Sequence, residues 1–231
     1  MDIYWSPMPN EIISPLKFGN PAPAIKYFPK PSGSNVNKCP AMIDYHKNTY
    51  ALTFPMSYNL TIAADGEVFT GDHTKEILEY LLTIRSQDEK LYSLNFNSLF
   101  ISEQSCEIEV FTPTTVKNNF IKNTFLVPGV FDIGEWIRPL ECAFFVDKEG
   151  AKLDINEGDV WAYIRFKTDE PVNIHRFFFT PEMYPLLNGI ARSVWPATKN
   201  VRKLEVFYNM LRRSGYKKNF MRLVKENLTD S

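Results

Sequence analysis

Residues Ile155–Phe166 have the sequence INEGDVWAYIRF, which is the clearest strand pattern in the chain. The Gly158–Asp159 pair is typical of a turn. After this turn, every second side chain is apolar, so one face of a β-strand carries Val160, Ala162, Ile164 and Phe166. The pattern predicts a strand with one face in the protein core.

The other face of this strand carries Trp161, Tyr163 and Arg165. One of the two faces is core, so the remaining one is either a second buried layer or a binding surface. Exposed rings of this kind usually mark contact with a partner. We therefore predict that Trp161, Tyr163 and Arg165, together with Trp136, bind another protein.

Comparable short patterns recur along the chain and predict further strands. A hairpin is predicted over residues 49–69, with its turn at Ala64–Glu67, and a second one joins residues 140–146 to residues 151–155. Other strands are predicted over residues 106–111, 125–136 and 172–179. Strands at intervals of about 8–12 residues are typical of sandwiches and barrels. The predicted fold is mainly β (α+β), an antiparallel β-sandwich or a jelly-roll-like barrel.

Helical periodicity predicts a short helix in the middle of the chain and a helical hairpin at its end. Apolar residues at helical spacing follow a capping residue, Asp72 or Thr74, and continue to Ile84. Residues 182–190 predict a short helix or turn. Two further helices are predicted over residues 201–211 and 220–228. Gly215 stands where a left-handed residue would end the first of these two.

The beginning of the chain differs in composition from the rest. Nine of the sixteen prolines lie between Met1 and Pro55, and proline disfavours helix interiors and central strands. We predict a proline-rich extended arm over residues 1–48 that lies across the surface of the domain or of a neighbouring subunit. A β-rich core over residues 49–181 and a basic helical segment over residues 182–231 complete one domain.

Cysteine content and apolar runs bear on the compartment. Cys39, Cys106 and Cys142 are odd in number and far apart, which favours a reducing compartment over a disulfide framework. No secretory signal is visible, and no apolar run approaches the roughly 20 residues of a membrane span. We therefore expect a soluble, intracellular protein without a membrane partner.

The basic residues are concentrated near the end of the chain. Residues 192–226 carry ten basic and two acidic side chains, which leaves 16 basic and 25 acidic residues elsewhere. Such a patch can contact phosphates, lie in solvent, or dock on an acidic surface of its own domain or of a partner. One alternative function is therefore nucleic-acid binding through Arg212, Arg213, Lys217, Lys218 and Arg222.

Signatures of enzymatic chemistry are weak in the sequence. No paired histidine motif, nucleophile elbow or phosphate-binding glycine loop is present. A metal site could still be built from His46, His73 and His175, so a cupin-like or 2-oxoglutarate-type metal-dependent oxygenase is a second alternative. Our main prediction includes no cofactor, no metal and no catalytic residues.

Three segments together resemble a family of proteins from phages. They are Cys39–Tyr50, Pro128–Ile133 leading into Trp136–Arg138, and Gly158–Val160 leading into Tyr163–Phe166. Across residues 39–180 the chain resembles uncharacterised proteins of contractile-tailed bacteriophages, especially those that infect marine cyanobacteria. The Gly158–Asp159 turn also resembles the turn before a ligand strand in cupin-like jelly rolls, although no histidine pair follows it. The phage resemblance implies a gene product of the host cytoplasm or the virion.

These observations lead to one main functional hypothesis. We predict a non-enzymatic phage protein of structural or host-interaction type. It would bind a phage protein, a host protein or further copies of itself through its aromatic face, its arm and its basic helices.

Overall fold

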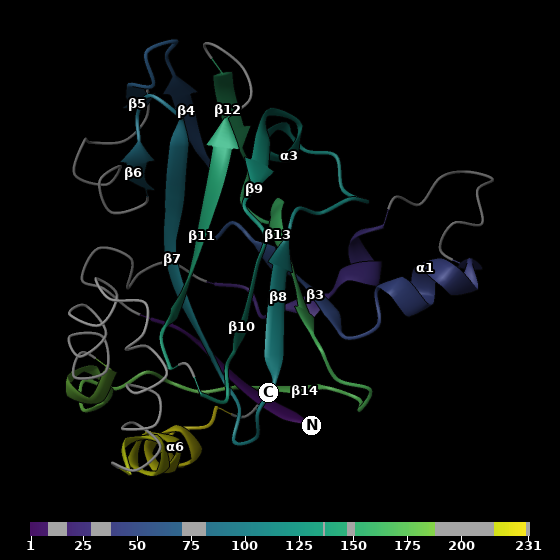
Figure 1. The fold of residues 1–231 in the computed structure, drawn as a ribbon, viewed down its shortest axis with the longest axis vertical. Coiled ribbons are helices and arrows are strands. Elements are labelled where there is room, and N and C mark those ends of the chain that lie inside the picture. The colour runs from purple at the N-terminus through teal and green to yellow at the C-terminus, as the bar shows by residue number, and fades with distance from the viewer. Residues whose placement is uncertain are drawn as a thin grey trace, which may run out of the picture.

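The computed structural model describes residues 1–8, 18–28, 38–70, 82–135, 137–146, 151–187 and 215–229. In these residues the chain is mainly β, with several antiparallel sheets in a sandwich-like arrangement and a few short helices (Figure 1). The predicted fold class is confirmed, and the described strands do not close into a barrel.

The largest sheet, sheet A, has six strands in the order β14-β1-β7-β11-β9, with β6 also paired to β7. Its strands are β1 (Asp2–Pro7), β6 (Leu82–Ser86), β7 (Leu91–Ile101), β9 (Thr124–Leu126), β11 (Pro139–Val146) and β14 (Asn173–Arg176). Every pair in it is antiparallel except β1 with β14, which is parallel. The first residues of the chain therefore form an internal strand of the sheet, and Ile3 and Trp5 are buried. For this segment the prediction of a surface arm is wrong.

Sheet B has five strands in the order β10-β8-β13-β3-β2. They are β2 (Ala22–Pro23), β3 (Thr49–Thr53), β8 (Glu107–Phe111), β10 (Gly129–Asp132) and β13 (Val160–Phe166). The segment predicted as one strand over residues 125–136 is divided between β9 in sheet A and β10 in sheet B. The chain thus passes from one sheet to the other at Val127–Pro128, because proline lacks the N–H that a central ladder needs.

Sheet C is formed by β12 (Ala151–Ile155), β4 (Tyr58–Ile62) and β5 (Val68–Thr70), in that order. The hairpin predicted over residues 49–69 is confirmed in its second part, where β4 pairs with β5 across a turn with Gly66 at φ 83°. Its first part is wrong, because Thr49–Thr53 is a separate strand, β3, in sheet B. The second predicted hairpin is wrong, because β12 pairs with β4 and β11 pairs with β7 and β9. The two strands exist as predicted, but they belong to different sheets.

The helices of the described residues are short. They are η1 (Ala24–Tyr27), α1 (Pro40–Tyr45), α3 (Asn119–Asn123) and α6 (Tyr216–Glu226), and residues 183–187 are also helical. The second helix of the predicted terminal hairpin is confirmed as α6, and Gly215 before it is left-handed with φ 70°. The first helix of that hairpin lies outside the described residues. The predicted mid-chain helix is described only from Leu82 onward, and there the chain is strand β6.

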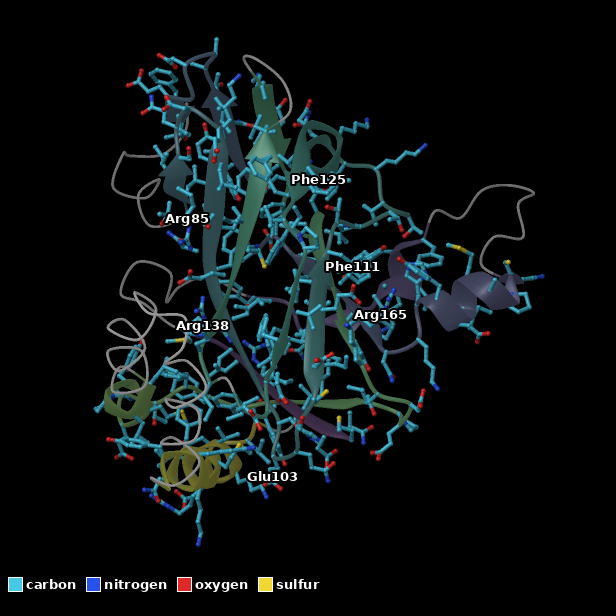
Figure 2. The ribbon with its side chains drawn as sticks, viewed as in Figure 1. Arg85, Glu103, Phe111, Phe125, Arg138 and Arg165 are labelled. Atoms are coloured by element: carbon cyan, nitrogen blue, oxygen red, sulfur yellow. The ribbon has the colours of Figure 1, made fainter. Side chains whose placement is uncertain are left out.

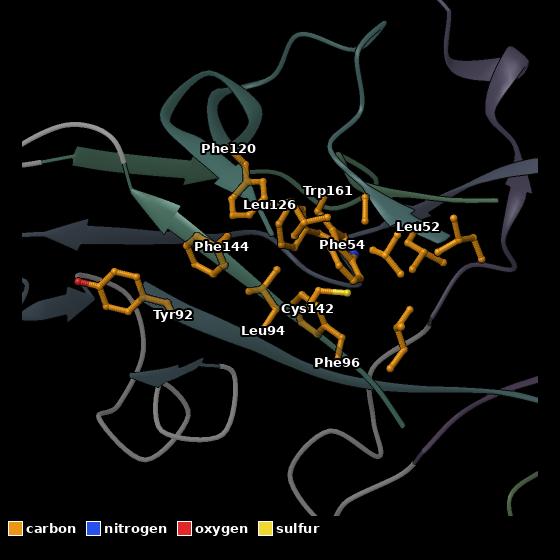
Figure 3. Packing of buried hydrophobic residues seen from close by; sticks show 14 of the residues in the cluster. Leu52, Phe54, Tyr92, Leu94, Phe96, Phe120, Leu126, Cys142, Phe144 and Trp161 are labelled. Carbon is orange, nitrogen blue, oxygen red and sulfur yellow. The ribbon is translucent and has the colours of Figure 1, made fainter. Parts of the chain in front are cut away.

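One aromatic core joins the inner faces of the three sheets (Figure 3). Phe54 lies near the centre of this core. The centroid of its ring is 5.1 Å from that of Phe120, 5.6 Å from that of Phe96 and 6.3 Å from that of Trp161. A second cluster packs Phe177, Phe179, residues 183–187 and α6 against the outer face of sheet A. A third, smaller cluster covers part of the outer face of sheet B. Both outer faces are thus partly buried, which a single alternating pattern does not reveal.

A β-bulge explains why strict alternation fails in β13. The register with β3 shifts between Val160 and Ala162, so two consecutive residues, Trp161 and Ala162, both join the main core. Val160 instead packs with Tyr163 in the third cluster. The predicted strand is confirmed, but the bulge exchanges the faces of Val160 and Trp161.

Candidate protein-binding surfaces

The aromatic residues predicted to bind a partner are mostly inside the protein. Trp161 is 3% exposed and Tyr163 is fully buried, and Trp136 lies outside the described residues. The prediction of an exposed aromatic face is therefore wrong for Trp161 and Tyr163. Tyr163 belongs to a second buried layer, because η1 and the end of α1 cover it and its hydroxyl contacts the Thr115 hydroxyl at 2.7 Å.

Arg165 remains at the surface, in a fully partnered position on the outer face of sheet B. The strand register places Val130, Glu109, Arg165 and Thr49 side by side across β10, β8, β13 and β3. The guanidinium forms an ion pair with Glu109 at 3.4 Å and donates to the Thr49 hydroxyl at 3.3 Å. It also donates to the backbone carbonyl of Tyr45 at 2.9 Å.

Two aromatic rings enclose the same guanidinium. Its central carbon is 4.5 Å from the Tyr45 ring centroid and 4.9 Å from that of Phe111. Cation–π contacts of this kind contribute about 0.5–2 kcal/mol, depending on desolvation. Arg165 and Phe111 therefore hold the end of α1 on sheet B (Figure 2).

His46 supplies a second attachment between α1 and the body of the protein. It is 6% exposed, and its Nδ1 lies 2.9 Å from the Met42 carbonyl. Its ring lies 4.6 Å from Phe28, 4.9 Å from Tyr45 and 5.9 Å from Tyr163, in edge-on geometry each time. These contacts anchor the C-terminal end of the short helix.

The rest of α1 extends away from the body (Figure 1), and none of its six residues is buried. Ile43 is 45% exposed and Tyr45 is 50% exposed, and Cys39 before the helix carries an exposed free thiol. We use the term Arg165 surface for Tyr45, Phe111, Val130 and Arg165 together with Ile43, which projects from a different face of α1 than Tyr45. It combines exposed apolar groups with one cation that is held in place.

The histidines of the alternative metal site are not brought together. His46 lies among the rings described above, and His73 lies outside the described residues. His175 is on β14, where its Nε2 is 3.0 Å from the Asp2 carboxylate, and this hydrogen bond lowers the pKa of Asp2. In the described parts of the chain, no group of three or more His, Cys, Asp or Glu side chains is placed to hold a metal ion.

The basic helix α6 is engaged with its own domain. Lys217 donates to the backbone carbonyl of Glu103 at 2.7 Å, and Lys225 forms an ion pair with the Glu103 carboxylate. Arg222 donates to the carboxylate of Glu226 one turn later at 2.7 Å. Lys218 is exposed beside them, on a hollow of about 690 Å³. Arg212 and Arg213, the other members of the predicted phosphate-binding set, lie outside the described residues.

A further exposed surface was missed by the sequence analysis. On sheet A, Phe125 is 56% exposed, Phe145 is 38% exposed, and the two residues are cross-strand neighbours on β9 and β11. The available signal was the alternation of these rings with Leu126, Phe144 and Val146, which are buried. A two-sided aromatic strand carries rings on both faces, so the pattern alone does not tell which rings are exposed.

Comparison with protein-family models, with curated proteins and with solved structures finds no match to this chain. No helix within the described ranges combines the length and the apolar character that crossing a membrane requires.

Proposed function

We propose that this chain is a non-enzymatic, protein-binding component of structural or host-interaction type, and that the Arg165 surface is its contact site. The observation that carries the proposal is the exposure of Ile43 and Tyr45 on a short helix that packs on the body of the protein through Met42. Exposed apolar side chains next to an ordered arginine have the composition of interface hot spots.

The fixed geometry of Arg165 supports this proposal. Its hydrogen bonds and ring contacts hold Tyr45 before any partner arrives. A side chain that is already ordered loses little conformational entropy on binding, so more of the contact free energy remains as affinity. The Tyr45 ring is large, amphipathic and rigid, which suits it to an interface centre.

The resemblance to proteins of contractile-tailed bacteriophages supports the setting of the proposal. It favours a phage or host protein as the partner and the virion or host cytoplasm as the location. Mass spectrometry of purified virions and of infected-cell lysate tests the two locations separately.

A capture experiment with matched variants tests the contact site. The wild-type chain, Ile43→Asp and Ile84→Asp are immobilised and exposed to lysate of infected cells. Ile84 is 48% exposed on β6 in sheet A, so it controls for the loss of an exposed isoleucine elsewhere. We expect a protein that wild type and Ile84→Asp retain and that Ile43→Asp loses.

The affinity of that protein is then measured with purified components. Loss of a hot-spot side chain weakens binding by about 2 kcal/mol or more, which is about thirtyfold. Equal affinity for Ile43→Asp and wild type, with circular dichroism unchanged, would rule out the Arg165 surface as the contact.

A further inference from the structure

The outer face of sheet A carries an apolar row that crosses three strands. The register places Phe125 of β9 opposite Phe145 of β11, and Phe145 opposite Leu91 of β7. Val127 lies two residues after Phe125 and donates its N–H to the Ala143 carbonyl at 2.8 Å, which extends the apolar area. We call Leu91, Phe125, Val127 and Phe145 the Phe125 row.

The Phe125 row is exposed to solvent, whereas the neighbouring part of the same face is covered. The described residues of the C-terminal segment pack on Tyr4, Leu99 and Ile101 of this face and on Ile137 beside it. Between that cover and the row lie polar groups, with Arg85 bonded to Glu141 at 2.7 Å and to the Ser93 hydroxyl at 2.8 Å. Phe125 lies next to α3, at the end of the sheet far from α6 (Figure 2).

Two strands near this face, β9 and β12, each have an edge N–H that is already bonded, which disfavours association by simple strand addition there. The N–H of Leu126 on the edge strand β9 donates to the Thr112 hydroxyl at 3.1 Å. On β12, the N–H of Asp154 donates to the Asn119 side chain at 3.0 Å. A partner at this end of the molecule is therefore expected to meet the face of the sheet rather than an edge.

Opposite charges stand at the two ends of the row. Lys122 of α3 is exposed beside Phe125, and the exposed Asp88 and Glu89, followed by Lys90, form the β6–β7 turn at the other end. All four residues and both phenylalanines line one hollow of about 700 Å³. The apolar centre therefore has one net positive end and one net negative end.

We infer that the Phe125 row is a two-fold homodimer interface. A two-fold interface brings the same patch of both subunits together, so residue i of one copy meets residue j of the other. Rotation by 180° about an axis that lies in the plane of the interface, near the two rings and perpendicular to the row, places Lys122 of each copy beside Asp88 and Glu89 of the other. The rings then meet at the centre of the interface, and the charge pairs lie at its rim.

A second copy satisfies this arrangement without any further assumption. The row is complementary to itself in polarity and in charge, whereas a different protein would need an independent match at both ends. Rim charges affect the rate and specificity of association more than its strength. Most of the affinity is therefore expected to come from the rings.

Sedimentation velocity over a concentration series tests the interface. The wild-type chain is compared with Phe125→Asp and with Phe69→Asp, since Phe69 is 50% exposed on the short strand β5 of sheet C and is a matched control. We expect a concentration-dependent dimer for wild type and Phe69→Asp. Phe125→Asp should weaken it by about thirtyfold or more, as for a central hot spot.

Charge reversal then tests the two-fold arrangement. Lys122→Glu alone, or Asp88→Lys combined with Glu89→Lys, places like charges together and weakens the dimer. The three substitutions combined restore it, because both ends change sign. The inference is overturned if wild type is monomeric at every concentration, if folded Phe125→Asp dimerises like wild type, or if the combined variant is not restored. The capture experiment at Ile43 is independent of all three outcomes.

Discussion

The Tyr58 hydroxyl is a buried polar group without a hydrogen-bond partner in the described structure. Tyr58 is 2% exposed in the main core, and its ring lies edge-on to Phe54 at 5.7 Å. Burial of a hydroxyl without a partner costs about 1–3 kcal/mol in proteins. Tyr58→Phe removes only that oxygen and leaves the ring packing in place. We therefore expect the substitution to stabilise the protein by about 1–2 kcal/mol.

Tyr92 provides the matched control. Its hydroxyl is also buried, but it donates to the Gly66 carbonyl at 2.8 Å, in the turn between β4 and β5. Tyr92→Phe loses this bond and leaves the carbonyl unpaired, so it should destabilise the protein by about 1 kcal/mol. The same chemical change thus has opposite signs at the two positions.

Urea and thermal unfolding measure both effects. For a chain of this size, 1 kcal/mol corresponds to about 2–4 °C in Tm, so Tyr58→Phe should melt about 2–8 °C higher. The pKa of Tyr58 is raised well above 10 by burial. From about pH 10 upward, the unfolded chain releases the proton of Tyr58 while the folded chain retains it, so the stability of the wild type falls with rising pH. Tyr58→Phe has no such proton, so its stability should fall less over the same pH range. A clearly destabilised Tyr58→Phe would refute the reasoning, because the hydroxyl would then have to be bonded.

Three further predictions concern surface elements. Asp132 is partly buried, which raises its pKa, but hydrogen bonds from Ser105, Cys106 and other groups outweigh this and lower the pKa below 3.8. The Asp132 carboxylate therefore stabilises the fold above the pKa of the unfolded chain, and this stabilisation is lost as the pH falls through the lower pKa of the folded chain. Asp132→Asn should accordingly lose about 2 kcal/mol of unfolding free energy at pH 7 and show a weaker acid dependence in urea melts. Directly after β10, the Ile133 N–H donates to the Cys106 carbonyl, and the Glu107 carbonyl of β8 accepts from the Lys167 N–H on the other side. Because successive N–H groups of a strand alternate in direction, the Phe131 N–H points toward β8 and the Val130 N–H points away from it. Val130→Pro should accordingly remain folded, while Phe131→Pro should cost about 3 kcal/mol; similar melting of the two variants would contradict this register. Arg165→Lys keeps the charge but loses the planar contacts with both rings, so limited proteolysis should cut near α1 faster than in wild type. Unchanged cleavage would show that the packing of Met42 and His46 holds the helix without these contacts.

Local chemistry explains the parts of the fold that were predictable. Gly66, Gly158 and Gly215 all have positive φ, and each stands where the sequence predicts a turn or a helix boundary. The strands β8, β13 and β14 lie within the predicted ranges. These features depend on short-range backbone preferences, which a few neighbouring residues already express.

Pairing between distant strands explains the errors. β11 and β12 are adjacent in the sequence, yet β12 pairs with β4 and not with β11. β7, with eleven residues the longest of the described strands, was not predicted, although Tyr92, Leu94 and Phe96 alternate in it and are all buried. Leu82 and Ile84 have helical spacing relative to residues before them but lie in a strand, because the edge of β7 is available for pairing.

The candidate site shows the same limit. Arg165 was selected from its strand, and it does lie at the surface with Tyr45 and Phe111. The exposed partners on α1 were not foreseen, because their role depends on where residues 38–46 lie against sheet B. Trp161 and Tyr163 were misjudged because a bulge and a covering segment bury them.

The sequence by itself determined that this chain is β-rich, where several of its turns lie, and that a basic helix stands near its end, because these follow from composition and short-range periodicity. Only the tertiary structure decided which rings are covered, which strands pair, and that Lys217 and Lys225 of the basic helix are bound to Glu103. The physical reason is that exposure and charge pairing depend on what lies opposite each side chain. In this fold the opposite group is usually far away in the sequence, as Arg165 and Tyr45 are.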